Sequence, residues 1–288
     1  MDSNLLKIMQ QNMARFSKSQ KRIAEYIMNH YDKAAFMTAA RLGQTINVSE
    51  STVVRFAAEL GYDGYPAMQK ALQEIIRNKL TAVQRMEVAN HRIDEHNVLD
   101  TALRSDVDNI LTTLNETDKA AFDAVVNSIL QSKKIYIIGV RSSAALAEFL
   151  GFYFRLIFPN VYLLGTTSTS EIFEQILHIS EEDVLIGISF PRYSKRTVKA
   201  MQYAQSRGAD VVAITDSAHS PLYQYATHKL TARGDMVSFV DSLVAPLSLI
   251  NALIVAVSMK KNKEISETFR SLEKIWDEYE VYEKFENE

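Results

Sequence analysis

The chain has 288 residues, a formal net charge of −3, 47% hydrophobic residues and 23% charged residues. This composition is typical of a globular protein long enough for two cores, and it excludes a disordered or fibrous chain. The absence of cysteine excludes disulfides, thiolate chemistry and cysteine-based metal sites, and the six histidines show no ligand spacing.

Neither the N-terminus nor the longest apolar run is typical of a membrane or export segment. The stretch MDSNLLKIMQQNMARF lacks the basic region and long apolar core of a signal peptide. The run from Leu243 to Met259 is interrupted by polar residues and Pro246, which favours a buried helix over a membrane span. We therefore expect a cytoplasmic protein with no membrane partner, no cofactor and no metal.

Residues 37–61, MTAARLGQTINVSESTVVRFAAELG, predict a helix-turn-helix. Thr38 can cap a short helix over residues 39–44, and Ser49 can cap a second helix that stops at Gly61. Hydroxyl side chains accept hydrogen bonds from the free N–H groups of a first turn, and glycine tolerates the left-handed conformation that ends a helix. The tight break between the two helices is typical of motifs that enter a DNA major groove.

The spacing of apolar residues assigns the two faces of this second helix. The buried face is expected to consist of Val53, Phe56, Ala57 and Leu60. The exposed start of such a helix holds the side chains that read bases. The expected DNA-contacting residues are Thr38, Ser49, Glu50, Ser51, Thr52, Arg55 and Lys70. A capped helical hairpin in an ordinary helical domain would show the same pattern.

Charge is distributed unevenly along the chain. Residues 1–80 hold 11 Lys and Arg against 7 Asp and Glu, a net charge of +4, whereas the rest holds 21 against 28, a net charge of −7. Two further helices expected at 17–30 and 66–79 carry basic residues on their outer faces. This asymmetry indicates a DNA-binding head on an acidic body, although a solvated basic face is the alternative.

The remaining chain divides by pattern. Residues 81–105 are polar and free of Gly and Pro, so we expect a linker that becomes helical, and residues 106–131 have apolar residues at helical spacing. The expected organisation is a helix-turn-helix domain over 1–80, a linker and helix over 81–120, an α/β domain over 121–262 and a C-terminal helix over 263–288.

The α/β domain is expected from strands that alternate with helices. The expected strands are 135–140 (IYIIGV), 161–165 (VYLLG), 183–190 (DVLIGISF), 209–216 (ADVVAITD) and the weaker 227–232 (THKLTA). Continuous apolar runs are typical of strands buried on both faces. The fold class is therefore an all-α head followed by a parallel five-stranded sheet flanked by helices.

Hydroxyl and basic residues follow three of these strands, at the edge where such sheets bind ligands. The expected ligand-binding residues are Gly139, Arg141, Ser142, Ser143, Thr166, Ser189, Arg192, Tyr193, Ser194 and Thr197. Hydroxyls and N–H groups at helix N-termini form anion sites, because the helix dipole favours negative charge there. Ser and Thr also cap helices without any ligand.

The whole chain resembles RpiR-type transcriptional regulators, which join a helix-turn-helix head through a linker to a SIS (sugar isomerase) domain. The head carries the resemblance in FSKSQKRIAEYIMNH and AARLGQTINVSESTVVRFAAELGYDGYPAMQKAL, and the body in IYIIGVRSSAALA and VLIGISFPRYSKRTVKAMQYAQSRGADVVAITD. It covers roughly residues 1–260. It implies a regulator of a carbohydrate or related catabolic operon that binds a double-stranded DNA operator and responds to a phosphosugar.

The chain departs from this family in two loops. The first loop is usually G-x-G-x-S, but Arg141 replaces the second glycine and Ser143 holds the serine place. The third is usually S-x-S-G with a threonine three residues later, whereas here it reads SFPRYSKRT. The added arginines can bind phosphate, bind the carboxylate of an acid metabolite, or pair with acidic residues of a neighbouring subunit.

Two alternative functions remain. Ketose–aldose isomerases use the same fold, but they need a general base. The candidate bases, Glu148, Glu171, Glu174, His178 and His219, occupy helix-surface positions and form no acid–base pair, so we expect a protein that is not an enzyme. A phosphosugar-binding adaptor independent of DNA would instead use the basic head as a protein interface.

The sequence also predicts a homodimer or homotetramer. Residues 241–259 are apolar on nearly every face, as expected of a helix buried in a core or a subunit interface. Residues 264–288 are amphipathic and suit packing on a partner or on their own domain. Paired subunits also fit a helix-turn-helix, because such motifs read paired half-sites.

Overall fold

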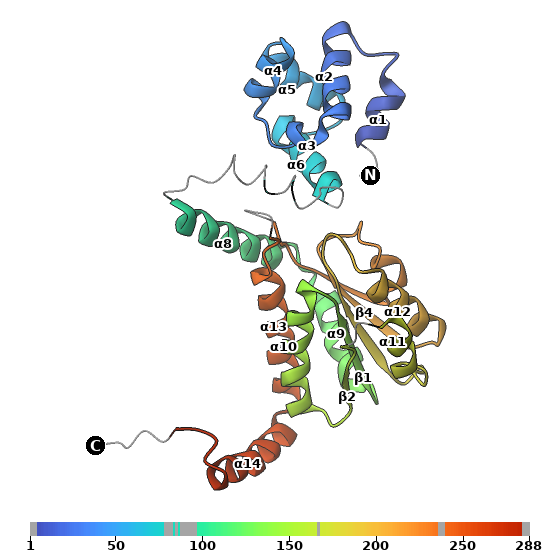
Figure 1. Ribbon diagram of the computed structural model, residues 1–288, viewed down its shortest axis with the longest axis vertical. Helices are drawn as coiled ribbons and strands as arrows, with labels where there is room; N and C mark the ends of the chain where they lie inside the picture. Colours follow the sequence, from blue (N-terminus) through green and yellow to red (C-terminus); the bar gives the residue numbers. More distant parts are fainter. Residues whose placement is uncertain are drawn as a thin grey trace, which may run out of the picture. The chain divides into compact units, whose positions relative to one another are not determined.

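The computed structural model describes residues 5–77, 83, 86, 97–165, 168–235 and 240–283. The chain divides into two compact units: residues 1–102 with 236–241, and residues 103–235 with 242–288 (Figure 1). The first unit contains α1 (Leu5–Asn12), α2 (Lys18–Asn29), α3 (Tyr31–Ala34), α4 (Ala39–Ile46), α5 (Glu50–Glu59) and α6 (Gly64–Arg77).

The helices of the first unit begin where side-chain caps place them. Ser17 and Gln20 form a capping box at the start of α2, and Thr38 and Ser49 cap α4 and α5, which confirms the predicted caps. Val53, Phe56 and Ala57 are fully buried, as predicted, in a core shared by α1 to α6. Leu60, at the end of α5, is half-buried.

Two contacts fix how the helices of this unit meet. Gly43 is buried in α4, and Asn47 adopts a left-handed conformation with φ 61° that ends this helix. The Val48 N–H then donates to the Gly43 carbonyl at 2.9 Å, so the turn lies directly against α4. Tyr65 on α6 donates its hydroxyl to the Met37 carbonyl at 2.8 Å, and burial raises the pKa of this phenol to about 12, which keeps it a donor.

The second unit is an α/β domain with a fully parallel sheet. Its helices are α8 (Val98–Glu116, from Leu103 on), α9 (Lys119–Gln131), α10 (Ser142–Ile157), α11 (Thr169–Gln175), α12 (Lys195–Ser206), α13 (Val244–Lys260) and α14 (Asn262–Glu278), with a 3-10 turn over Tyr223–Tyr225. Its strands are β1 (Ile135–Gly139), β2 (Val161–Leu163), β3 (Val184–Ile188), β4 (Asp210–Thr215) and β5 (His228–Thr231), in the order β2-β1-β3-β4-β5. All five predicted strands are present.

Helices cover both faces of the sheet. One apolar core joins α9, α10 and α13 to β1, β3, β4 and β5, and a second core on the opposite face includes α11 and α12. Every residue of β1 and β3 is buried, as expected of strands covered on both faces. The predicted fold class is therefore confirmed.

The helical pattern predicted over 106–131 is interrupted in the structure. The helix α8 ends at Glu116, and Asp118 caps the new helix α9 by accepting the Ala120 N–H at 2.8 Å. The apolar spacing continues through this break, so the pattern alone does not locate it.

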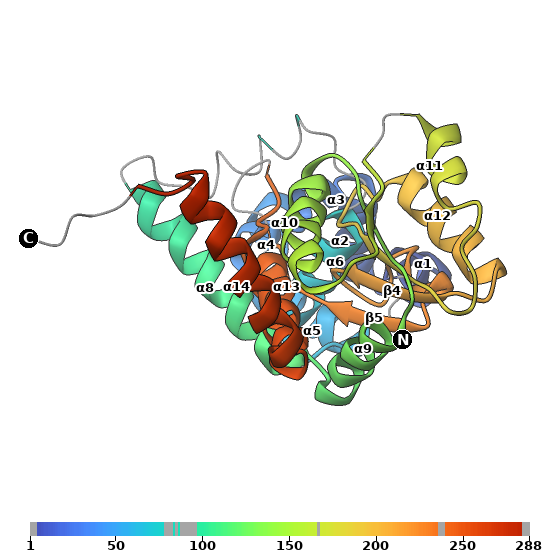
Figure 2. The same ribbon diagram turned by 90° about the horizontal axis from the view of Figure 1, so that it is seen from below.

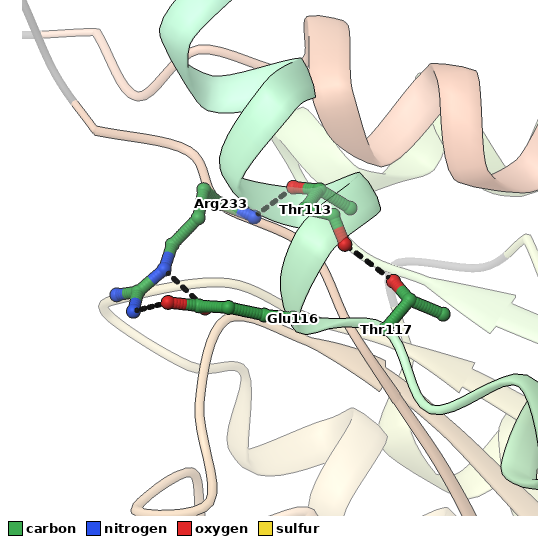
Figure 3. A network of polar contacts seen from close by, with 4 residues as sticks. All are labelled: Thr113, Glu116, Thr117 and Arg233. Atoms are coloured by element: carbon green, nitrogen blue, oxygen red, sulfur yellow. Dashed lines mark hydrogen bonds and ion pairs between the residues drawn. The ribbon is translucent and has the colours of Figure 1, made fainter.

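A polar network attaches α8 to the segment that follows β5 (Figure 3). The guanidinium of Arg233 donates to both carboxylate oxygens of Glu116 at 2.9 and 2.8 Å, and its backbone N–H donates to the Thr113 hydroxyl at 2.9 Å. One turn earlier, the Asn109 side chain bonds both the N–H and the carbonyl of Asp235. Two-pronged contacts of this kind hold α8 in one register against the edge of the sheet domain.

Among the described residues, no single helix is both long and apolar enough to cross a membrane.

We predict that Gly43→Ala lowers the free energy of unfolding of the first unit by about 1–3 kcal/mol, the usual cost of overpacking. A Cβ at this position would lie 2.7 Å from the Val48 carbonyl oxygen, a backbone atom that cannot move without distorting the turn. Urea unfolding of the full chain, followed by circular dichroism, measures the effect. The control is Gly165→Ala, whose Cβ meets no atom within 4 Å. An unfolding curve for Gly43→Ala that matches the control would contradict the prediction.

Candidate DNA interface and effector site

The first turn of α5 presents a cluster of hydroxyl groups. Ser49 Oγ lies 3.0 Å from Ser51 Oγ and 2.7 Å from Thr52 Oγ1, and it also accepts the Thr52 N–H at 3.3 Å. Ser49 and Ser51 are exposed, whereas Thr52 is half-buried. The cap of this helix is therefore also a polar surface at its N-terminus.

Charged side chains lie around this cluster. Glu50 and Arg55 are exposed, and Arg55 Nε is 3.3 Å from the Ser51 carbonyl, so the arginine lies along the same helix face. Arg22 from α2 donates to the Asn47 carbonyl at 3.5 Å, which adds a second cation at the turn before α5.

The remaining two expected DNA contacts lie on other helices. Thr38 is exposed at the start of α4, where its hydroxyl accepts the Arg41 N–H at 3.2 Å, and Lys70 is exposed on α6. The structure thus brings five of the seven residues together on the start of α5. This surface has hydroxyls, a carboxylate and Arg55 on the first two turns of α5, with Arg22 of α2 beside them. It suits hydrogen bonds to bases and phosphates.

The second site follows from the strand order. The chain crosses from β1 to β2 on one side and then returns past β1 to β3, so the topological switch point lies between β1 and β3. Gly139 pairs with Ile188 at the carboxyl ends of these strands. The following helices α10 and α12 pack on opposite faces of the sheet. The loops after β1 and β3 therefore diverge, which is the arrangement that forms a ligand crevice in such sheets.

The loop after β1 is tightly folded. Arg141 has φ 61° and ψ −125°, a backbone region that favours glycine, and its side chain is exposed. A Cβ on Gly139 would collide with the Ser143 carbonyl oxygen, so α10 begins directly over the end of β1. Ser142 is exposed and Ser143 is buried.

The loop after β3 is organised by two serines. The buried Ser189 accepts the Ser194 N–H on its hydroxyl at 3.1 Å, and Ser194 caps α12 by accepting the Thr197 N–H at 3.5 Å. Thr197 is fully buried, and its hydroxyl oxygen has no hydrogen-bond partner among the described residues. Between the serines, Phe190 and Pro191 are buried and anchor the loop.

Positive charge accumulates at this loop. Arg192 is exposed and adopts a left-handed conformation with φ 67°, so both loops at the switch point contain an arginine at positive φ. Lys195 and the half-buried Arg196, in the first turn of α12, add two cations that the sequence reading did not include. These charges reinforce the positive end of the helix dipole.

Sequence reasoning also missed a hydrogen-bonded cluster at the end of β4. The Tyr193 hydroxyl donates to Oδ1 of the buried Asp216 at 2.7 Å, which joins the β3 loop to the next strand. The Thr215 hydroxyl lies 2.8 Å from both the Ser189 carbonyl and Ser220 Oγ. The same rule used for the other strands, polar residues directly after a buried strand, finds this group in TDSAHS.

The expected ligand-binding residues thus form two neighbouring groups. Gly139, Arg141, Ser142 and Ser143 follow β1, and Ser189, Arg192, Tyr193, Ser194 and Thr197 follow β3. Thr166 lies outside the described residues. The two groups meet at adjacent strand ends, as parallel pairing requires.

Comparison with known proteins agrees with this division. Residues 3–79 match the model of the helix-turn-helix domain of the rpiR family, and residues 128–256 match that of the SIS domain. The regulator HexR of Escherichia coli strain K12 is 27% identical over 278 residues, which cover 93% of this chain and 92% of that protein.

Solved structures share the fold. The sugar isomerase domain of an RpiR transcription factor from Sphaerobacter thermophilus is 27% identical, with a TM-score of 0.60, and the match covers 62% of this chain and 99% of that one. NanR of Vibrio vulnificus, solved in complex with ManNAc-6P, is 24% identical with a TM-score of 0.59 over 96% of this chain and 99% of that one.

The two units therefore define a DNA-binding transcriptional regulator, with the helix-turn-helix in the first unit and a SIS domain in the second. The chain belongs to the RpiR family, in which a helix-turn-helix precedes a SIS domain.

We predict that Arg55→Ala and Ser51→Ala each weaken specific DNA binding by about 1–3 kcal/mol, the usual loss for one base contact. The probe is a duplex selected with the wild-type protein from a random-sequence pool, and binding is measured by gel shift at fixed salt. The exposed Arg207, in the second unit, gives the charge-matched control Arg207→Ala. Wild-type affinity in both α5 variants, with unchanged circular dichroism, would refute this interface.

Proposed function

We propose that this protein regulates a carbohydrate or related catabolic operon, and that a phosphosugar or similar anionic metabolite controls its DNA binding from the crevice between the β1 and β3 loops. The observation that carries the effector site is the pair of arginines at positive φ, Arg141 and Arg192, one in each loop at the switch point.

The physical argument begins with backbone strain. A residue other than glycine in the left-handed region costs about 1–2 kcal/mol, and such strain is typical of functional sites. Here both strained residues carry a guanidinium, which binds a phosphate or carboxylate through two parallel hydrogen bonds. A ligand anion held by both loops would offset the strain.

The first turn of α12 provides the remaining donors. The N–H groups of Lys195 and Arg196 have no acceptor within their own helix, and they point toward the carboxyl edge of the sheet. The buried Thr197 hydroxyl, which has no partner among the described residues, lies in the same turn. Together these groups suit the oxygens of a phosphate.

The neighbouring cluster suits the neutral part of such a ligand. Asp216 lies at the adjacent strand end, together with the hydroxyls of Tyr193, Thr215 and Ser220. Carboxylates and hydroxyls of this kind can accept hydrogen bonds from the hydroxyl groups of a sugar, and the hydroxyls can also donate to them. The similarity to NanR, solved with ManNAc-6P, agrees with a phosphosugar. A small acid metabolite is the alternative ligand.

We predict that Arg192→Ala weakens effector binding ten- to a hundredfold without changing DNA affinity in the absence of effector. The probe is the compound that most raises the melting temperature in a panel of hexose 6-phosphates, pentose phosphates and 6-phosphogluconate, with inorganic phosphate as reference. Binding at 100 times the dissociation constant should stabilise by about 2.7 kcal/mol. Calorimetry on Ser189→Ala, which loses the hydroxyl that accepts the Ser194 N–H, should show a similar loss.

Arg192→Gly is the matched variant, because glycine keeps the left-handed backbone and removes the charge. Loss of affinity in both variants supports the charge, and loss in Arg192→Ala alone supports a backbone effect. Unchanged affinity in both, together with Ser189→Ala, would place the pocket elsewhere. A changed oligomeric state in Arg192→Ala, seen by sedimentation, would instead make the arginine a subunit contact.

A regulator without enzymatic activity is the reading we favour over a sugar-phosphate isomerase. All five candidate bases are exposed, which supports it, because a general base acts from within the site. Glu148, Glu171 and Glu174 lie on helices as expected, whereas His178 and His219 lie in turns. An isomerase would interconvert aldose and ketose phosphates in an NMR assay. The adaptor independent of DNA would fail to shift any genomic fragment on a gel.

We further propose a cytoplasmic homodimer or homotetramer that assembles through the second unit, and domain boundaries at the expected positions near residues 80, 120 and 262. Only one side of α13 is buried, and Leu247, Val255 and Met259 on its other side are exposed. An apolar helix face open to water supports an interface with another subunit. Two copies would also present two α5 helices to paired half-sites.

A further inference from the structure

Helix α14 is only partly covered in a single copy of the chain, where it meets α10 and α13 and where Ile265, Leu272 and Trp276 are half-buried. Ile265, Phe269, Leu272, Trp276 and Tyr279 recur every three or four residues along one face, yet none of the 17 residues of this helix is buried. Tyr279 is 71% exposed. Because an amphipathic helix of this length has little stability in water unless its apolar face is covered, the exposed part of this face calls for a surface that its own copy does not provide.

An apolar groove lies near the opposite end of α13. It has a volume of about 270 Å³ and runs between α8, the start of α9 and the first half of α13. The residues that line it include Ile110, Leu114, Phe122, Ala245, Leu249 and Ala252. At its rim Leu114 is 69% exposed, and Leu103, Val107 and Leu111 extend the exposed apolar strip along α8.

The α14 of the same copy does not reach this groove. The 17 residues of α13 span about 25 Å. The groove lies at the start of α13, whereas α14 follows its end and departs at a bend of 96°. Figure 1 shows α8 and α14 at opposite ends of α13, and in both views the two helices extend to the same side of it (Figures 1 and 2).

We propose that α14 of one copy packs on the α8 groove of a second copy, and that the second copy's α14 returns the same contact. A two-fold axis near Asn251, an exposed residue close to the middle of α13, would pair two α13 helices antiparallel. The end of each α13 then lies beside the start of the other, which brings each α14 to the partner's α8. This inference rests on the proposed homo-oligomer.

A second copy fits better than a different protein because each chain supplies both halves of the contact. An isologous arrangement covers two helices and two grooves at once and leaves neither exposed. A foreign helix in the groove would leave α14 uncovered, and a foreign groove for α14 would leave the α8 strip uncovered.

The absence of cysteine allows a direct test by disulfide cross-linking. Full-length chains carrying Val107→Cys, Leu111→Cys or Leu114→Cys are mixed, after subunit exchange, with a tagged full-length chain carrying Phe269→Cys. Mild oxidation should give a covalent dimer that contains one chain of each kind for at least one α8 position. Ser271→Cys, on the opposite face of α14, is the control and should give none. If none of the three α8 positions gives a mixed dimer, the proposed packing of α14 on the partner's α8 is refuted.

Sedimentation equilibrium provides the second measurement. Phe269→Glu should raise the dimer dissociation constant at least tenfold, whereas Ser271→Glu, which adds the same charge on the polar face, should stay within twofold of wild type. The fold of each copy should be unaffected, because neither side chain is buried in a single copy.

The possible outcomes separate the two proposals. A wild-type chain that is monomeric at micromolar concentration would refute both the proposed oligomer and the packing of α14 on the partner's α8. The other outcome is a dimeric wild type, a covalent homodimer of the Asn251→Cys variant and an unchanged dissociation constant for Phe269→Glu. This outcome would support the oligomer and refute only the packing of α14 on the partner's α8.

Discussion

The parallel pairing of β1 with β3 is the constraint on which the second unit depends. All residues of both strands are buried, so a shift in register would expose apolar side chains on both faces of the sheet. With that pairing fixed, the connections to α10 and α12 leave toward opposite faces. The two loops, each with an arginine at positive φ, then diverge at one edge of the sheet, and the proposed ligand crevice follows from this topology.

The sequence was sufficient for features that depend on local patterns. Continuous apolar runs located the strands, and Thr38 and Ser49 located helix starts because a side-chain hydroxyl meets the N–H groups of the next turn. Positive φ at Arg192 was not predictable, because arginine rarely adopts this conformation and nothing in its side chain signals it. At Arg141 a signal was present, because this residue stands where the family usually has a glycine. The ion pair of Arg233 with Glu116 was also beyond a sequence reading, because its partners are 117 residues apart.

Helix α13 shows a further limit of sequence patterns. An amphipathic helix reveals its buried side through the period of its apolar residues, but α13 is apolar on both its packed side and its open side. Its composition therefore indicates that both sides of the helix are covered, but it does not show which side packs within the same chain. Only the structure separates Leu249 and Leu253, which pack on the sheet domain, from Leu247 and Val255, which do not.

The attachment of α8 to the segment after β5 has a mechanical consequence. Asn109 and Arg233 join this helix to the edge of the sheet, so the helix and the strand end move as one body. Leu103, where the second unit begins, lies six residues before Asn109. At a helical rise of about 1.5 Å per residue this is a lever arm of roughly 9 Å, and a tilt of about 10° at Asn109 would displace Leu103 by about 1.6 Å. A small rearrangement beside the sheet would thus be enlarged along α8 before it reaches the boundary of the second unit.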